Sequence, residues 1–316
     1  MGYGMLSHAM VMFQNSFGTK HVDSLQPIAF TEESLVYNRE QIMEQGMYAN
    51  ISNNEYYHGF TKVEGSLSME ASPIALGWFL KSAIGLSSTT SDTDKQTHVF
   101  KPRSSDFGDR SAGNPMTIEL NRDVGSAAVY YDMVGNNLTL NAANGELLTA
   151  TLDFVGAGFT KKAAGSPTFP DAKMFKWDQF SGSFDGNGIV ELQEFSFTMN
   201  NNLEARYIMQ ASSAPYRVKR SDRQMLELSG TMTFETHSYW DAFIAGTNHH
   251  VIFNWKTTET PNELTIDIPN LRFLSFEPHP SGAGAVEASF TAACVYHQGS
   301  GTAIEITLVN TQEAFI

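Results

Sequence analysis

Apolar and small residues alternate along two separate stretches of this 316-residue chain. The alternating positions of the first stretch recur in the second at a constant offset of 165, so that Val63, Gly65, Leu67 and Met69 correspond to Leu228, Gly230, Met232 and Phe234. Because successive side chains of a strand point to opposite faces, this alternation predicts two strands, each with one apolar face. The recurrence at so long a distance indicates an internal repeat.

A short apolar segment with a tryptophan follows each of these strands. Ser72 and Pro73 have the residue types of an N-cap and a first helical position, and Gly85 suits a C-cap, so a helix is predicted from Ile74 to Ala83. Its shorter counterpart is Ser238 to Ala245. We expect two cores in which helix packs on sheet, formed by Val63, Leu67, Met69, Trp78 and Phe79 in one copy and by Leu228, Met232, Phe234, Trp240 and Phe243 in the other.

The remaining pattern predicts a mainly β fold, with a β-sandwich or barrel-like domain and one flanking helix present in two tandem copies. Apolar runs separated by Gly and Asn turns indicate further strands at 98–101, 116–121, 127–133, 138–141 and 146–155, and then at 195–199, 251–256, 264–268, 271–276 and 286–296. The residues from 156 to 170 are rich in Gly, Ala, Ser and Pro and have the composition of a linker. We therefore place the domains at 1–160 and 171–316, joined by 161–170.

Two further stretches of the copies can be aligned. Ser196 aligns with Ser34, Phe197 with Leu35 and Met199 with Tyr37. In the last strand of each copy, Ala288 and Phe290 align with Ala150 and Leu152.

Each copy also carries a long polar insertion before its repeated strand, at 38–61 and at 200–227. Loops of this length are uncommon in compact domains and are usually functional. The first insertion has one basic and three acidic residues, whereas the second has five basic and three acidic residues. We expect these oppositely charged insertions to contact different partner surfaces, through Arg39, Glu40, Glu44, Glu55, Tyr56 and Tyr57 in the first and Arg206, Arg217, Lys219, Arg220 and Arg223 in the second.

Composition narrows the classes of function. Acidic residues exceed basic ones by 14, so the protein as a whole is expected to repel nucleic acid. The single cysteine, Cys294, excludes an intrachain disulfide and fits a reducing cytoplasm. Neither a secretion signal nor a membrane span is expected, because the longest apolar stretch runs only from Ile74 to Leu80.

Motifs for catalysis or cofactor binding are missing from the sequence. It contains no P-loop, no dinucleotide-binding glycine motif and no Gly-x-Ser-x-Gly elbow. We expect His249 and His250 to be a solvated pair, Asp185 to Gly188 to form a plain β-turn, and Cys294 to be a packing thiol. The expectation is a protein that is not an enzyme and has no cofactor and no metal.

Several segments of the first copy resemble the tail tube proteins of long-tailed (siphovirus-type) bacteriophages. The resemblance rests on packing and strand motifs at 3–5, 13–18, 31–35, 63–70, 73–83 and 147–156. It implies subunits that close into a ring, with inner sheets joined edge to edge into a β-barrel around a lumen. It also implies rings stacked into the tube through which phage DNA leaves the capsid.

The resemblance also suggests partners and a location. The partners would be further copies of the chain, a tape measure protein, a tail terminator and tail tip proteins, and DNA would pass through the lumen without specific binding. The protein would be made in the cytoplasm of the host bacterium and become part of the virion tail. Because the chain carries two copies of the domain, we expect three chains to form a pseudo-hexameric ring.

Two other functions are left open by the residues. A receptor- or carbohydrate-binding β-sandwich at a tail tip could use exposed aromatic residues such as those at 56–58. A hydrolase could use scattered carboxylates, but no recognisable pair of them occurs in the sequence.

Overall fold

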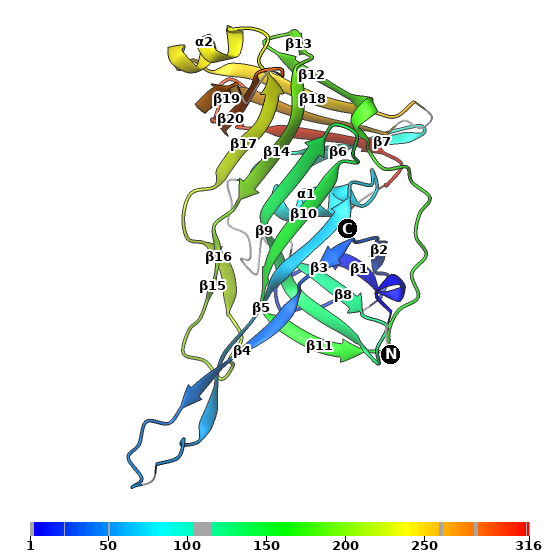
Figure 1. Cartoon of the computed structure of the whole chain (residues 1–316). Coiled ribbons are helices and arrows are strands. Elements are labelled where there is room, and N and C mark those ends of the chain that lie inside the picture. The colour runs from blue at the N-terminus through cyan, green and yellow to red at the C-terminus, as the bar shows by residue number, and fades with distance from the viewer. Residues whose placement is uncertain are drawn as a thin grey trace.

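The protein is described here by a computed structural model that covers residues 3–21, 23–49, 51–103, 115–258, 262–280, 284–313 and 315. Antiparallel strands dominate it, and the described residues form two α-helices (Figure 1). The predicted mainly β fold with short flanking helices is therefore confirmed.

The elements fall into two groups in chain order, which we call the first half and the second half. The first half comprises η1 (Gly4–Leu6), β1 (His8–Phe13), β2 (Gln26–Ile28), β3 (Glu32–Glu33), β4 (Val36–Met43), β5 (Tyr56–Glu70), α1 (Leu76–Ala83), β6 (Leu86–Asp92), β7 (Lys95–Phe100), β8 (Met116–Asn121), β9 (Ala127–Ala143), β10 (Thr149–Gly156) and β11 (Gly158–Lys162). The second half comprises η2 (Trp177–Gln179), β12 (Phe180–Phe184), β13 (Asn187–Ile189), β14 (Leu192–Asn200), β15 (Leu203–Arg206), β16 (Arg217–Arg220), β17 (Met225–Thr233), α2 (Ser238–Ala245), β18 (His249–Lys256), β19 (Glu263–His279), β20 (Glu287–Cys294) and β21 (Glu305–Asn310).

Each half consists of two layers that share one long strand. In the first half the outer layer runs β2–β1–β8–β9–β11, and the inner layer runs β4–β5–β10–β9. The 17-residue strand β9 contributes to both layers. The second half has the same pairings, with β13–β12–β18–β19–β21 outside and β14–β17–β20–β19 inside, and its shared strand β19 also has 17 residues.

The two inner layers form one continuous sheet. Strand β14 pairs with the C-terminal part of β9, from Glu194 opposite Ala143 to Asn200 opposite Asn137. The order β4–β5–β10–β9–β14–β17–β20–β19 results, and we call it the eight-stranded sheet. We call the contact between β9 and β14 the internal junction.

The apolar cores of the two halves are continuous, so the expectation of two separate cores is wrong. One cluster of buried residues extends from Ala9 to Phe315 and includes residues of both halves. Of the predicted core residues, Val63, Leu67, Met69, Trp78, Phe79, Leu228 and Met232 are buried, whereas Phe234, Trp240 and Phe243 are half-buried around α2.

Gly65 and Gly230 lie at equivalent places in the two halves. A Cβ atom on Gly65 would come within 2.3 Å of the Ser34 carbonyl oxygen, and one on Gly230 within 2.4 Å of the Glu194 carbonyl oxygen. Only glycine allows the neighbouring strand to approach so closely. The offset of 165 between the two copies of this strand is therefore structurally meaningful.

This anchor corrects the other two alignments, which are each two residues out of register. Gly65 lies beside Leu35 and opposite Phe154, whereas Gly230 lies opposite Phe195 and Phe290. Leu35 thus corresponds to Phe195, and Phe154 to Phe290. A slip of two residues keeps every side chain on its own sheet face, so the apolar pattern cannot detect it.

Most predicted elements are present, with shifted ends. α2 has the predicted bounds, whereas α1 begins two residues late, after a turn in which Ser72 Oγ accepts a hydrogen bond from the Ile74 amide (3.3 Å). The predicted pairs of short strands at 127–141 and at 264–276 are the continuous strands β9 and β19.

The linker composition was misleading. Residues 158–162 form strand β11, and a Cβ atom on Gly158 would lie 2.0 Å from the Tyr131 ring. This glycine provides space for an aromatic side chain and does not mark a flexible segment.

The far end of the chain packs against the first half. The Phe315 ring is buried beside Trp78 and His98, at centroid distances of 5.4 and 4.7 Å, and Lys81 Nζ donates a hydrogen bond to the Phe315 carbonyl oxygen. The imidazole of His98 bonds Asn310 Oδ1 (3.2 Å) and the Gln312 carbonyl oxygen (3.0 Å), and burial lowers its pKa. Strand β21 also pairs with β7, which gives the two halves a second junction.

Candidate functional site

One face of the eight-stranded sheet packs on the core, and the opposite face, which we call the polar face, carries hydroxyl, amide and carboxylate side chains. Hydroxyl pairs bridge neighbouring strands, with Ser34 and Ser66 2.9 Å apart and Ser68 and Thr151 3.0 Å apart. The acidic side chains at the outward positions of these strands are Glu64, Glu70, Asp153, Glu194, Glu227, Glu277 and Glu287.

Positive charge is sparse on the strands of this face, and the β15–β16 hairpin with its basic residues lies beside the end that carries Glu64 and Val155. Within the described segments 36–43, 61–70, 134–143, 149–156, 192–200, 225–233, 271–279 and 287–294, the Lys and Arg residues are Arg39, Arg272 and Lys62. Its ammonium lies 2.6 Å from Glu64 Oε2, which offsets its charge. A surface of this kind repels phosphate groups and gives DNA little counter-charge to hold it.

The first insertion is part of a long hairpin formed by β4 and β5, which projects from the body of the protein (Figure 1). Arg39 and Glu40 lie on β4, and Glu44 and Glu55 lie further out, where the Glu44 amide bonds the Glu55 carbonyl oxygen (2.9 Å). Apolar and aromatic side chains are exposed along this hairpin, at Ile42, Met47, Tyr48, Ile51, Tyr56 and Tyr57.

The second insertion folds differently, so the two insertions are not equivalent in placement. Its hairpin, β15–β16, lies against the first half: the Tyr207 ring is 4.2 Å from the Phe60 ring, and the Thr61 amide bonds the Ser213 carbonyl oxygen at 2.9 Å. Leu203 and Val218 are buried against Val134 and Ala157 of the first half. Burial of these apolar side chains stabilises the hairpin against the first half of the same chain.

The basic residues of the second insertion lie on or beside that hairpin. Arg217, Lys219 and Arg220 are partly buried on β16, and Arg206 on β15 pairs with Glu204 at 3.1 Å. Arg223 lies beyond the hairpin and is exposed. This contact within the chain could not be predicted from the sequence, because the residues of the hairpin suit a surface of the same chain as well as one of another chain.

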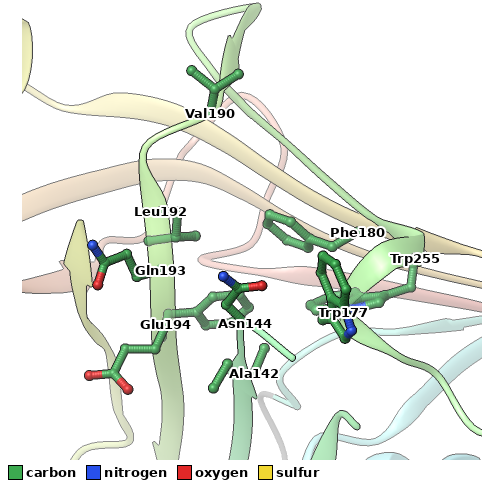
Figure 2. A pocket seen from close by; sticks show the side chains of 11 residues that line it. Ala142, Asn144, Trp177, Phe180, Val190, Leu192, Gln193, Glu194 and Trp255 are labelled. Atoms are coloured by element: carbon green, nitrogen blue, oxygen red, sulfur yellow. The ribbon is translucent and has the colours of Figure 1, made fainter. Parts of the chain in front are cut away.

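A pocket of about 260 Å³ lies at the internal junction, beside the start of β14 (Figure 2). Trp177, Phe180 and Trp255 face Leu192 of β14 across it, and residues 142–144 at the end of β9 contribute its lower side. The short helix η2 thus places Trp177 where the two halves meet.

The other candidate residues have structural surroundings. His249 is not solvated as expected: it stacks on Phe184 (4.6 Å) and lies 2.7 Å from Asp185 Oδ2, whereas His250 lies 2.8 Å from Asp267 Oδ1. Asp185 and Gly186 form the predicted turn between β12 and β13, both with positive φ. Cys294 is buried, and burial raises its pKa to about 12, as expected of a packing thiol.

Neither a metal site nor a membrane-spanning helix occurs among the described residues. No group of three or more His, Cys, Asp or Glu side chains within them is arranged to hold a metal ion. The described part of the chain contains no helix long and apolar enough to span a bilayer.

Comparison with known proteins identifies the family. No curated protein matches the sequence. The family model described as "Phage tail tube protein" matches residues 46–294, which is 249 of the 316 residues and includes the projecting end of the first hairpin and nearly all of the eight-stranded sheet. A match over so much of the chain shows that this protein, a structural component of the virion tail, belongs to the phage tail tube protein family.

Proposed function

We propose that three copies of this chain close into a ring and that such rings stack into the tube through which DNA is ejected. The observation that carries this proposal is the eight-stranded sheet, which ends in β4 on one side and in β19 on the other. Strand β4 pairs with β5 on one side, and no described strand pairs with its other side. After Leu271, β19 still pairs with β20, but no described strand pairs with its other side. Joining these edges would remove two exposed strand edges from every copy.

The count of three chains rests on the recurrence of the strand pairings. We infer that the halves are duplicated tail tube domains, because every main pairing of the first half has a counterpart in the second half. The internal junction would then be equivalent to one of the six contacts between neighbouring domains in a ring of six domains. Three chains of eight strands each would give an inner barrel of 24 strands, with the polar face toward the lumen.

The polar face suits a conduit for DNA. Its carboxylates and hydroxyls, with the single lysine offset by Glu64, would let a duplex slide without being held. Stacking would then depend on the projecting hairpin of the first half. By resemblance, the ends of the tube would meet a tape measure protein, a terminator and tip proteins, after synthesis in the host cytoplasm.

Replacing Tyr56 and Tyr57 by Ser should prevent stacking while the subunit stays folded. Both side chains are about half exposed in the single chain, so removing them costs little packing within it. They would, however, be the apolar contacts of the hairpin with the adjacent ring. Electron microscopy of the variant should show single rings where the wild type forms tubes, and long tubes of the variant would contradict this role for the hairpin.

Electron microscopy of the purified protein, combined with mass measurement of isolated rings, tests the proposal directly. We expect stacked rings, three chains per ring and six similar lobes around each lumen. Discrete particles without a lumen would favour the alternative of a tail-tip binding protein, and six chains per ring would refute the duplicated architecture.

A further inference from the structure

The internal junction provides a template for the contact between chains, and the inference that follows rests on the proposed ring. Within the chain, β14 lies antiparallel to β9 with Asn200 opposite Asn137, Thr198 opposite Thr139 and Phe197 opposite Leu140. The strands of the eight-stranded sheet alternate in direction. A β4 strand of the next copy would therefore also lie antiparallel to β19.

Residues of β4 can be matched with those of β14 through the strand that both pair with. Tyr37 lies opposite Val63, and Phe197 lies opposite Leu228, the counterpart of Val63 at the offset of 165. Tyr37 therefore corresponds to Phe197. By the same pairing Asn38, opposite Lys62, corresponds to Thr198. Counting two residues further along β4, Glu40 corresponds to Asn200, because the bulge between Arg39 and Gln41 has its extra residue on β5.

Residues of β19 can be matched with those of β9 in the same way. Asn137 lies opposite Asp153, and Glu277 lies opposite Ser289. Because Phe154 corresponds to Phe290, Asp153 corresponds to Ser289, and Glu277 takes the place of Asn137. His279 then takes the place of Thr139.

We propose that β4 of one copy pairs with β19 of the next in the register of the internal junction, with Asn38 opposite His279 and Glu40 opposite Glu277. The contact within the chain has two neutral amides, Asn200 and Asn137, where the contact between chains has two carboxylates. Like charges directly opposite each other in a sheet are destabilising. The contact between chains is thus the weaker one, and ring closure is restrained by charge.

The charged groups around the two glutamates do not cancel this repulsion. Glu40 borders a surface pocket with Arg39, Lys62, Glu64 and Glu204, and its Oε2 accepts a hydrogen bond from the Phe60 amide (3.4 Å). Lys62 is paired with Glu64, and the Arg39 guanidinium lies over the Tyr37 ring with Nη1 3.4 Å from His58 Nε2. Glu277 Oε2 lies 3.4 Å from His279 Nε2, and Glu287 follows on the neighbouring strand opposite His279.

The backbone of β19 adds to the difference. Pro278 and Pro280 take the places of Leu138 and Leu140 of β9, and proline has no amide hydrogen to donate across the contact. Prolines of this kind are a usual protection of strand edges that must not pair indiscriminately.

The short helices η1 and η2 support the same arrangement. Each three-residue helix lies just before the first outer strand of its half, with one residue between η1 (Gly4–Leu6) and β1 and none between η2 (Trp177–Gln179) and β12. η2 lies at the internal junction, with Trp177 lining its pocket. The side chains of η1 are largely exposed, including Met5 at 97% and Leu6 at 60%, and a following copy would cover them.

Disulfide cross-linking tests the register. In a Cys294→Ala background, Asn38→Cys with His279→Cys should link neighbouring chains of assembled rings, because directly opposite positions bring the Cβ atoms within disulfide reach. Asn38→Cys with Glu277→Cys, which needs a slip of two residues, should remain monomeric on a denaturing gel. Thr139→Cys with Thr198→Cys is the matched positive control, since these residues are opposite each other within one chain.

Removing the charge of Glu277 tests whether repulsion between Glu40 and Glu277 restrains ring closure. Glu277→Asn, which copies the internal junction, should lower the protein concentration needed for ring formation by about tenfold, because three contacts per ring change together. The advantage should shrink at high salt. Glu227→Gln on the interior strand β17 removes the same charge from the same face and should leave assembly unchanged.

The outcomes separate this inference from the proposed function. Rings that form but link only through the slipped pair, or that assemble no better with Glu277→Asn than with Glu227→Gln, would overturn the inference and leave the ring intact. A wild-type protein that forms neither rings nor tubes would overturn both.

Discussion

Replacing Trp78 by Ala should destabilise the protein by about 3–5 kcal/mol, the usual cost of emptying a buried site of this size. The Trp78 side chain is 2% exposed, and its ring lies 5.4 Å from both Phe13 and Phe315, which come from opposite ends of the chain. Its loss would therefore open a cavity between the start of the first half and the last described residue. Urea unfolding followed by circular dichroism would measure the change.

Trp240 is the matched control, because it is the third residue of α2 as Trp78 is of α1. Its side chain is only half-buried and stacks on His237 at 5.6 Å, so its replacement by Ala should cost less, about 1–2 kcal/mol. Equal losses of unfolding free energy in the two variants would mean that burial in the single chain does not determine how much these residues contribute to stability.

Lysines placed on the polar face should convert a surface that repels DNA into one that binds it. Thr151→Lys, Thr198→Lys and Thr291→Lys together would add positive charge to the alternate strands β10, β14 and β20 without placing two lysines opposite each other. Proteins with 6–10 phosphate contacts lose roughly 10³–10⁵ in DNA affinity between 50 and 200 mM salt. We expect assembled tubes of this variant to bind duplex DNA with an affinity that falls by a similar factor over this range of salt concentration.

Co-sedimentation of labelled duplex DNA with tubes at the two salt concentrations would measure this effect. The triple Thr→Gln variant of the same positions adds side-chain length without charge and should behave as the wild type. DNA binding by the wild type or the glutamine variant at moderate salt would contradict the assignment of this face to the lumen, as would a lysine variant that binds no DNA.

The local pattern of residues predicted the local structure well. The alternation around Leu67 and Met232 gave the strands and their buried faces, because a period of two leaves only one face apolar. It could not give the pairing register, since moving a strand by two residues conserves that face. Gly65 and Gly230 hold the missing information, but their meaning depends on a neighbouring backbone that the sequence does not display.

Contacts between the halves were beyond sequence reasoning. Both insertions are predicted to contact partner surfaces, yet one projects (Figure 1) and the other covers Val134 and Ala157 of its own chain. Likewise, nothing near Phe315 in the sequence indicates that its ring belongs beneath α1. Such choices depend on packing between segments that are far apart in the chain.

The position of Phe315 bears on how the protein is made. Lys81 and Phe315 are 234 residues apart, so a ribosome working at about 5–20 residues per second takes roughly 10–50 s to supply the second after the first. During that time α1 lacks the aromatic ring that packs against Trp78. A nascent chain therefore cannot complete the core of its first half until the second half is almost finished. Translation itself thus delays the appearance of a completely packed subunit.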